Sequence, residues 1–453
     1  MNVYDLEKAS VTGGIENILD LEPRNYHASV ETYFSPFWFK HILRWKQDLV
    51  ACHGVSYLWF RTTLHHLLDI AFTDDLGEYV LAFEWRNEPE TIKKFAKTLI
   101  KKHSDRIRLY NAYAMIEWTR GNKDTASGVF MAAINMARSM LDDIGDDAIL
   151  LWRSWIWCYL EDGDTDAALK HLLCISDGVV NAALEVGPTA IIRTKQYQTS
   201  KRDHLLHTNS TTNALIFAEL VALLAYLIST DRTQPQSNSQ GSIMAYLTEI
   251  TSHSRNLTSR KSSESSHHEW LLQSSARLFF NHARAGPFQP ALLRSTMQQY
   301  LTHFPSNSIF LSIFEWNEAR FRIEGRVRAF FNTQPKLTLS QHIFRIHHES
   351  KVGTIHSVRA AFEHAVDVTS AARSNAGIWR LYVFFMAKNF RDKTKDVWYR
   401  ALRACPWVKE LYIVGFEVLG KEVDGKELMG TWRVLGEKGL RIHVDLEEIF
   451  EDM

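Results

Sequence analysis

An amphipathic pattern runs through residues 395–412. Apolar side chains, including Trp398 and Ala401, fall on one face of a predicted helix, and charged side chains fall on the other. Pro406 lacks a backbone N–H and disfavours helix in the preceding residue, so we expect the first helix to end just before it and a second to start with Trp407. Because this hairpin leaves one apolar face uncovered, it must stack on similar units, which predicts a repeat protein.

Helical spacing of apolar residues recurs along much of the chain, whereas residues 1–30 have weak periodicity, so we expect a loose or partly ordered lead-in there. Pro89 opens one of these helices, where its missing N–H costs nothing. The predicted helices cover residues 36–45, 57–70, 91–100, 309–316, 358–366 and 378–385. The predicted fold is therefore all-α, a solenoid of helical-hairpin repeats.

The clearest internal repeat has an offset of 42 residues, from Leu109 to Leu151. Each copy has aromatic residues three apart, a Gly-Asn or Gly-Asp corner, and then an alanine that permits close helix crossing. The two copies are Leu109, Tyr110, Tyr113, Gly121, Asn122 and Ala126, and Leu151, Trp152, Trp155, Gly163, Asp164 and Ala168.

A polar segment, residues 231–268, interrupts the helical pattern. Serine, threonine, asparagine and glutamine dominate it, and only 243–250 has a short helical pattern. Such a composition buries too little surface to offset its ordering entropy, so we expect a mobile insertion. The predicted organisation is a lead-in over 1–30, helical repeats over 31–230, this insertion, and further repeats over 269–453.

Composition narrows the functional classes. Lysine plus arginine and aspartate plus glutamate number 52 each, so no overall electrostatic field draws the 453-residue chain to nucleic acid or membranes.

The four cysteines are far apart, which favours buried thiols in a reducing compartment. The first residues do not have the pattern of a signal peptide, so we expect none. The longest apolar stretch, 214–228, contains Glu219 and is too short to span a bilayer, so we expect a soluble protein without membrane partners.

Motifs that carry chemistry are missing from the sequence. It has no phosphate-binding glycine loop, no His-Glu-x-x-His and no Gly-x-Ser-x-Gly, so we expect no enzyme activity and no cofactor. Its three His-His pairs place neighbouring side chains about 100° apart on a helix, which suits a shared metal poorly. These pairs are His65/His66, His267/His268 and His347/His348.

One basic run is a candidate for RNA contact. It comprises Lys93, Lys94, Lys97, Lys101, Lys102, Arg106 and Arg108. A row of cations at this density suits a phosphate backbone. The alternative interpretation is a solvated helix face, because the apolar face of the same helix already explains the spacing. This alternative is the one we favour.

The hairpin pattern resembles the half-a-tetratricopeptide repeats of RNA-processing scaffolds. Within that class, the last hundred residues are similar to the necessary-for-RNA-interference family, the nuclear RNAi-defective proteins of type two. The similarity rests on Ile355–Ala365, Ile378–Tyr382, Tyr399–Trp407 and Glu437–Ile442. Its structural signature comprises Trp379, Tyr382, Trp398, Ala401, Pro406, Trp407 and Tyr412.

This resemblance implies a nuclear adaptor in RNA silencing, splicing and regulation of the exosome-associated RNA helicase. The implied partners are nuclear RNA-processing proteins, among them spliceosome-associated factors and that helicase. The family's long charged N-terminal region, with its helicase-contacting segment, has no counterpart here, so we expect a shortened form or a truncated gene model. A direct RNA-binding repeat protein of the pre-mRNA processing machinery is the alternative.

Overall fold

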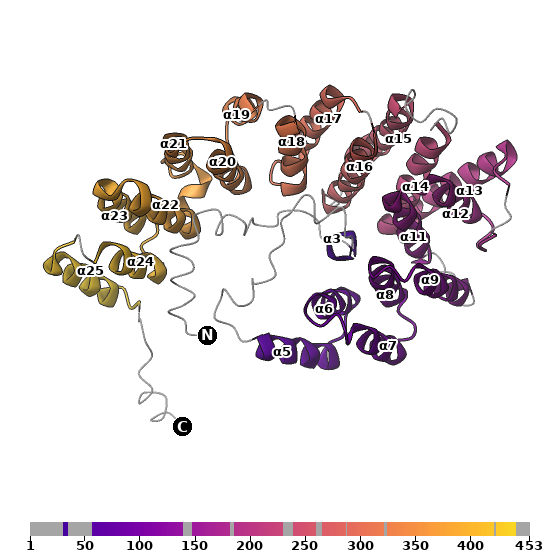
Figure 1. The fold of residues 1–453 in the computed structure, drawn as a ribbon, viewed down its shortest axis with the longest axis horizontal. Coiled ribbons are helices and arrows are strands. Elements are labelled where there is room, and N and C mark those ends of the chain that lie inside the picture. The colour runs from indigo at the N-terminus through magenta and orange to yellow at the C-terminus, as the bar shows by residue number, and fades with distance from the viewer. Residues whose placement is uncertain are drawn as a thin grey trace. The chain divides into compact units, whose positions relative to one another are not determined.

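The computed structural model describes residues 30–34, 57–138, 147–181, 185–229, 239–259, 265–286, 288–320, 324–420 and 423–440. Within these ranges every assigned element is an α-helix or a short 3-10 helix (Figure 1). The all-α prediction is confirmed. The chain divides into two compact units: Tyr26–Tyr300, and Leu301–Met453 grouped with Met1–Asn25, which lies outside the described residues.

The helices of the first unit follow one another along the chain. They are α3 (Val30–Phe34), α5 (Tyr57–Ile70), α6 (Asp74–Asn87), α7 (Ile92–Lys102), α8 (Ile107–Thr119), α9 (Lys123–Arg138), α11 (Ile149–Asp162), α12 (Thr165–Cys174), α13 (Pro188–His207), α14 (Thr211–Ser229), α15 (Ser239–Ser259), α16 (Ser265–Ala285) and α17 (Pro290–His303). The division between the units falls within the last of these.

The second unit continues with helices of similar length. They are α18 (Ser308–Arg320), α19 (Glu324–Thr333), α20 (Leu339–Val352), α21 (Ile355–Ala365), η2 (Ala371–Ser374), α22 (Ala376–Asn389), η3 (Arg391–Lys393), α23 (Thr394–Ala404), α24 (Lys409–Leu419) and α25 (Gly425–Glu437). In both units a helix packs mainly on the next helix and the next but one, as α8 does on α9 and α11, and α22 on α23 and α24. This succession is the packing of a helical-repeat solenoid.

The predicted 42-residue repeat corresponds to the hairpins α8/α9 and α11/α12. Both corners turn at a glycine with left-handed backbone, Gly121 (φ 86°) and Gly163 (φ 84°), a conformation that glycine adopts without a Cβ penalty. Ala126 and Ala168, on the second helix of each hairpin, are fully buried. Trp155 stacks on an aromatic ring of the preceding hairpin, so adjacent repeats share one core.

The hairpin α23/α24 turns at Pro406, and α23 ends at Ala404 as predicted. The second helix starts at Lys409, two residues later than the predicted Trp407, because the Val408 N–H first closes a turn onto the Cys405 carbonyl, at 3.3 Å. Trp398 is fully buried, and a Cβ added at Gly415 would lie 2.0 Å from its ring. The two helices can therefore approach this closely only with glycine at that position.

The predicted polar insertion contains a packed helix. Helix α15 extends well beyond the 243–250 pattern, and it packs closely on α14. Ile243, Tyr246 and Ile250 are buried at helical spacing, which explains why this part of the segment is ordered against its neighbour. The domain boundary over 231–268 stays a prediction, and the compact units themselves divide at Tyr300.

Helix α14 contains the apolar stretch 214–228. Among the described residues it is the one helix long and apolar enough to cross a membrane, by length and composition alone. Our prediction that this stretch is too short was therefore wrong. Two thirds of the helix window (67%) is buried against other helices, as in the core of a soluble protein, and Glu219 at its centre is buried in an ion pair.

Some predictions fall outside the described residues. These are the lead-in up to residue 29, the helix over 36–45 and Cys52. The predicted helix over 57–70 is confirmed as α5, and the helix opened by Pro89 begins at Ile92.

Candidate interaction surfaces

The basic run predicted for RNA contact lies on α7 and the start of α8. Four of its lysines project into solvent, and none of them makes an ion pair with the described part of the chain: Lys93, Lys94, Lys97 and Lys101. The opposite face of α7 is buried through Ile92, Ala96 and Leu99. The helix is therefore amphipathic as predicted, and its lysine face is open to water.

The other three cations of the run are held by carboxylates of neighbouring elements. Lys102 Nζ lies 2.6 Å from an Asp69 carboxylate oxygen, and Arg106 lies 3.4 and 4.0 Å from two aspartates. Arg108 contacts the buried carboxylate of Glu78 at 2.5 Å, and burial raises the pKa of Glu78 to about 7. The structure thus divides the predicted run into an open lysine face and a paired group.

The signature residues of the second unit meet in its core. Trp379, Tyr382, Trp398, Ala401 and Tyr412 are each at most 1% exposed. Polar atoms of the aromatic residues are satisfied locally, for example Trp398 Nε1, which donates to the Leu411 carbonyl at 2.8 Å, and Tyr412 Oη, which donates to the Pro406 carbonyl at 3.0 Å. Trp407 lies at the same corner but is 62% exposed, so it is not a core residue.

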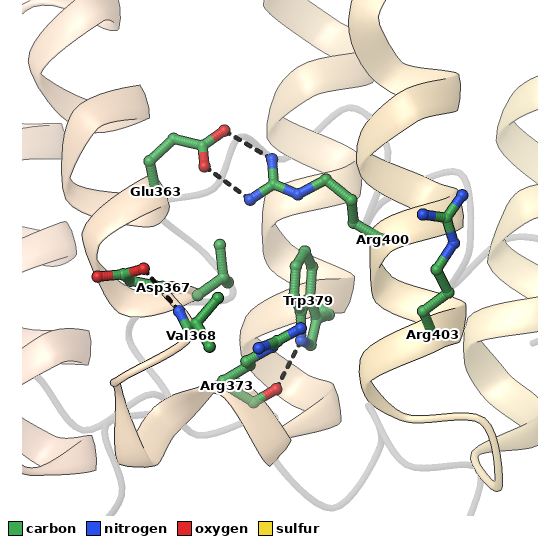
Figure 2. A pocket seen from close by; sticks show the side chains of 8 residues that line it. Glu363, Asp367, Val368, Arg373, Trp379, Arg400 and Arg403 are labelled. Carbon is green, nitrogen blue, oxygen red and sulfur yellow. Dashed lines mark hydrogen bonds and ion pairs between the residues drawn. The ribbon is translucent and has the colours of Figure 1, made fainter.

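A pocket of about 190 Å³ opens between α21, η2, α22 and α23. Figure 2 shows Arg400 reaching across to Glu363, with which it makes two hydrogen bonds of 3.0 and 2.8 Å. The Arg400 guanidinium also lies 5.7 Å from the centre of the Trp379 ring. The pocket lining comprises Glu363, Val366, Asp367, Val368, Arg373, Trp379, Arg400 and Arg403.

Two other arginines line this pocket, and their side chains have no polar partner among the described residues. The guanidinium groups of Arg373 and Arg403 make no hydrogen bond or ion pair within the described residues (Figure 2). Guanidinium groups of this kind recognise carboxylates and phosphates. Sequence reasoning missed the pocket, since only the spacing of Arg400 and Arg403 on one helix hinted at it, and Arg373 comes from another element.

Two of the described histidines pair with single carboxylates, and the described cysteines are free thiols. Among the described residues no group of three or more His, Cys, Asp or Glu side chains is placed to hold a metal ion. His65 contacts Glu84 at 2.9 Å, and His348 contacts Glu315 at 2.8 Å. The three described cysteines are buried thiols, and burial raises the pKa of Cys158 well above its usual value.

Fold and sites together define an all-α helical-repeat protein with surfaces suited to binding. No family profile matches the chain, and no solved structure does. Curated relatives do match. The chain is 25% identical over 425 residues to the protein of Mus musculus named "Nuclear exosome regulator NRDE2", a match that covers 80% of this chain and 34% of the relative.

Two further relatives carry similar names and match a similar share of this chain. The chain is 23% identical over 418 residues to the Homo sapiens protein of the same name, which covers 80% of this chain and 34% of the relative. It is 20% identical over 386 residues to "Protein NRDE2 homolog" of Schizosaccharomyces pombe, with 81% of this chain and 37% of the relative covered. These homologues confirm the predicted resemblance. The chain spans about a third of the length of the curated relatives it matches.

Proposed function

We propose that this protein is a nuclear, non-catalytic adaptor that binds protein or ribonucleoprotein partners of the RNA-processing machinery. The observation that carries the proposal is the match, over 80% of the chain, to proteins named as nuclear exosome regulators. Those names support a nuclear location and a regulatory role. The proposal also has finer parts. These are roles in RNA silencing and splicing, the identity of the repeats as half-a-tetratricopeptide repeats, and contact with spliceosome-associated factors or an exosome-associated RNA helicase.

The fold supports an adaptor. Stacked helical hairpins present long surfaces on which a partner's helix or extended segment packs. The equal numbers of acidic and basic residues give the chain no general attraction for RNA. Binding is therefore expected to depend on local contacts with particular partners.

Direct RNA binding is the second candidate, and one observation favours it. The lysine face of α7, formed by Lys93, Lys94, Lys97 and Lys101, is exposed and unpaired within the described part of the chain. Such a face suits phosphate groups. The two candidates differ in their response to salt, because contact of four lysines with the phosphates of a single strand, at a salt slope of about −0.7 per contact, lowers affinity about 50-fold between about 50 and 200 mM salt.

Affinity recovery from nuclear extract tests the proposal. The tagged full chain is expected to recover nuclear RNA-processing proteins after nuclease treatment and at about 200 mM salt. A variant with Lys93, Lys94, Lys97 and Lys101 changed to glutamate is expected to recover the same proteins. The matched control carries the same charge change at four exposed lysines elsewhere: Lys336, Lys388, Lys393 and Lys426.

The outcomes separate the candidates. Recovery that disappears after nuclease treatment contradicts the adaptor proposal. If, in addition, the α7 variant and not the control loses a salt-sensitive shift of single-stranded RNA, the direct RNA-binding candidate replaces it.

A further inference from the structure

Helix α3 is a five-residue element buried inside the first unit. Val30, Glu31, Thr32 and Phe34 are at most 6% exposed. A helix of this length has no independent stability in water, so the surrounding helices hold its shape. Figure 1 shows it beside α6 and α8, outside the succession of hairpins, and both helices contact it. We call the surfaces of α6, α8, α11 and α16 that contact it the α3 groove.

The C-terminal end of α3 fits an aromatic part of this groove. Phe34 is fully buried, with its ring centre 6.5 Å from that of Trp85 on α6. Tyr33 meets Tyr79 edge to face at 6.1 Å. Thr119 on α8 donates a hydrogen bond of 3.0 Å to the Phe34 carbonyl, which satisfies a backbone group at the helix end.

Its N-terminal end places a carboxylate between two buried arginines. Glu31 hydrogen-bonds to Arg153 of α11, and its Oε1 lies 3.7 Å from Arg277 Nη1 on α16. Both arginines are 2% exposed. Each stacks on a tryptophan, with Arg153 at 4.5 Å from the Trp270 ring centre and Arg277 at 4.1 Å from that of Trp157.

Each arginine already has a carboxylate partner without α3. Arg153 bonds to Glu219, and Arg277 bonds to Glu161 at 2.6 and 2.9 Å. The two guanidinium charges are thus balanced before Glu31 is counted, and an empty groove would not leave a bare buried charge. The buried Arg277 Nη1 has no hydrogen-bond partner within the described structure and faces the Glu31 carboxylate. This donor indicates a place for a carboxylate ligand.

We propose that this groove is a docking site for a short helix of a partner protein with a glutamate and a phenylalanine three residues apart, and that Val30–Phe34 occupies the site within the same chain. The inference rests on the proposed adaptor function and names the class of segment that the adaptor binds. A carboxylate at one end and an aromatic ring at the other match the helix-in-groove mode of recognition. Glu219 and Glu161 beside the arginines disfavour a polyanion such as RNA.

Tethering makes the internal segment a strong competitor. A segment of the same chain acts at an effective concentration in the millimolar range, so a free peptide of equal affinity displaces it poorly. The test therefore weakens the internal occupant first. In the full chain, Glu31→Ala with Phe34→Ala removes both anchoring side chains and leaves the groove residues unchanged.

The probe is a fluorescein-labelled peptide that spans Val30–Phe34 and four flanking residues on each side, measured by fluorescence anisotropy. The double variant is expected to bind it at least tenfold more tightly than the wild-type chain does. Peptides with the Glu31→Gln or the Phe34→Ala change are expected to bind the double variant at least tenfold more weakly than the unchanged peptide. Trp398→Ala, in the other unit, is the control for non-specific binding by a destabilised chain.

A folded double variant that binds no peptide overturns the inference, because α3 is then only a fixed part of the core. If circular dichroism shows that the double variant is unfolded, Glu31→Gln alone replaces it, and failure of that folded variant to bind the peptide more tightly than the wild-type chain does overturns the inference as well. Failure here with intact nuclease-resistant recovery leaves the proposed function standing. Peptide binding without recovery of nuclear proteins supports the docking site and contradicts the proposed adaptor function.

Discussion

Each unit has an apolar core, but the described part of the first unit also buries complete Arg–Glu ion pairs within its core. In the second unit a continuous apolar cluster runs from α20 to the residues after α24 and includes Trp379, Phe362 and Trp398. In the first unit, Arg153 and Arg277 are buried among glutamates of three other positions in the chain. An apolar core tolerates many arrangements of similar volume, whereas buried charges require particular partners. The buried ion pairs of the first unit therefore determine which of its helices meet at Arg153 and Arg277.

Trp398→Ala is expected to have the largest effect. It truncates a fully buried side chain that donates a hydrogen bond to Leu411 and fills the space beside Gly415. The free energy of unfolding is expected to fall by about 4 kcal/mol, the range for buried aromatic truncation being about 3–5. Urea unfolding followed by circular dichroism measures the change.

Trp407→Ala is the matched control in the same hairpin. Because its side chain is 62% exposed, the free energy of unfolding is expected to change by no more than about 0.5 kcal/mol. Similar losses for the two tryptophans would contradict the assignment of one to the core and the other to the surface.

Glu219→Ala is expected to have a somewhat smaller effect. The fully buried carboxylate accepts hydrogen bonds from Arg153 and from Trp157 Nε1, the latter at 2.7 Å. Its loss leaves Arg153 with Glu31 as its one carboxylate partner among the described residues, and the expected cost is about 3 kcal/mol, the lower end for breaking a buried pair. Thermal unfolding of the variant beside wild type provides the measurement.

A replacement of all three linked charges sharpens the comparison between the cores. Arg153→Met combined with Glu31→Gln and Glu219→Gln removes these charges, roughly keeps their volume and leaves an acceptor for Trp157 Nε1, so it is expected to cost clearly less than Glu219→Ala alone. A triple variant as unstable as the single one would mean that the charges add net stability, as an apolar contact does.

The sequence predicted the apolar core of the second unit better than it predicted the buried ion pairs of the first. Trp398, Ala401 and the corner at Pro406 lie within a dozen residues, so local periodicity is sufficient to predict their hairpin. The repeat corners at Gly121 and Gly163 were predictable for the same reason. The exposure of Trp407 was harder to predict, because this residue lies in the corner and so belongs to neither helical face.

The candidate sites depend on contacts that no local pattern contains. Glu31, Arg153, Glu219 and Arg277 are separated by tens of residues in sequence, and only the folded stack brings them together. Glu219 was visible in the sequence as a charge in an apolar stretch, and this indicated that it required a partner, but not which one. On α7 the periodicity predicted the exposed lysines, whereas the pairing of Lys102 and its neighbours required the structure.

The smallest predicted effect concerns the ion pair at the rim of the second unit's pocket. The hydrogen bonds from Arg400 lower the pKa of Glu363 below its usual value of 4.5. A depressed carboxyl pKa adds stability that is complete above the unfolded pKa and is lost as pH falls through the folded one. Since both side chains are partly exposed, the contribution is expected to stay within about 1 kcal/mol. Glu363→Gln should therefore lower the melting temperature slightly at neutral pH, and this difference from wild type should disappear as pH falls below 4.5. A difference that persists unchanged in acid would show that Glu363 stabilises the unit through packing, and that the charge of its carboxylate, which accepts hydrogen bonds from Arg400 and Tyr382, contributes nothing.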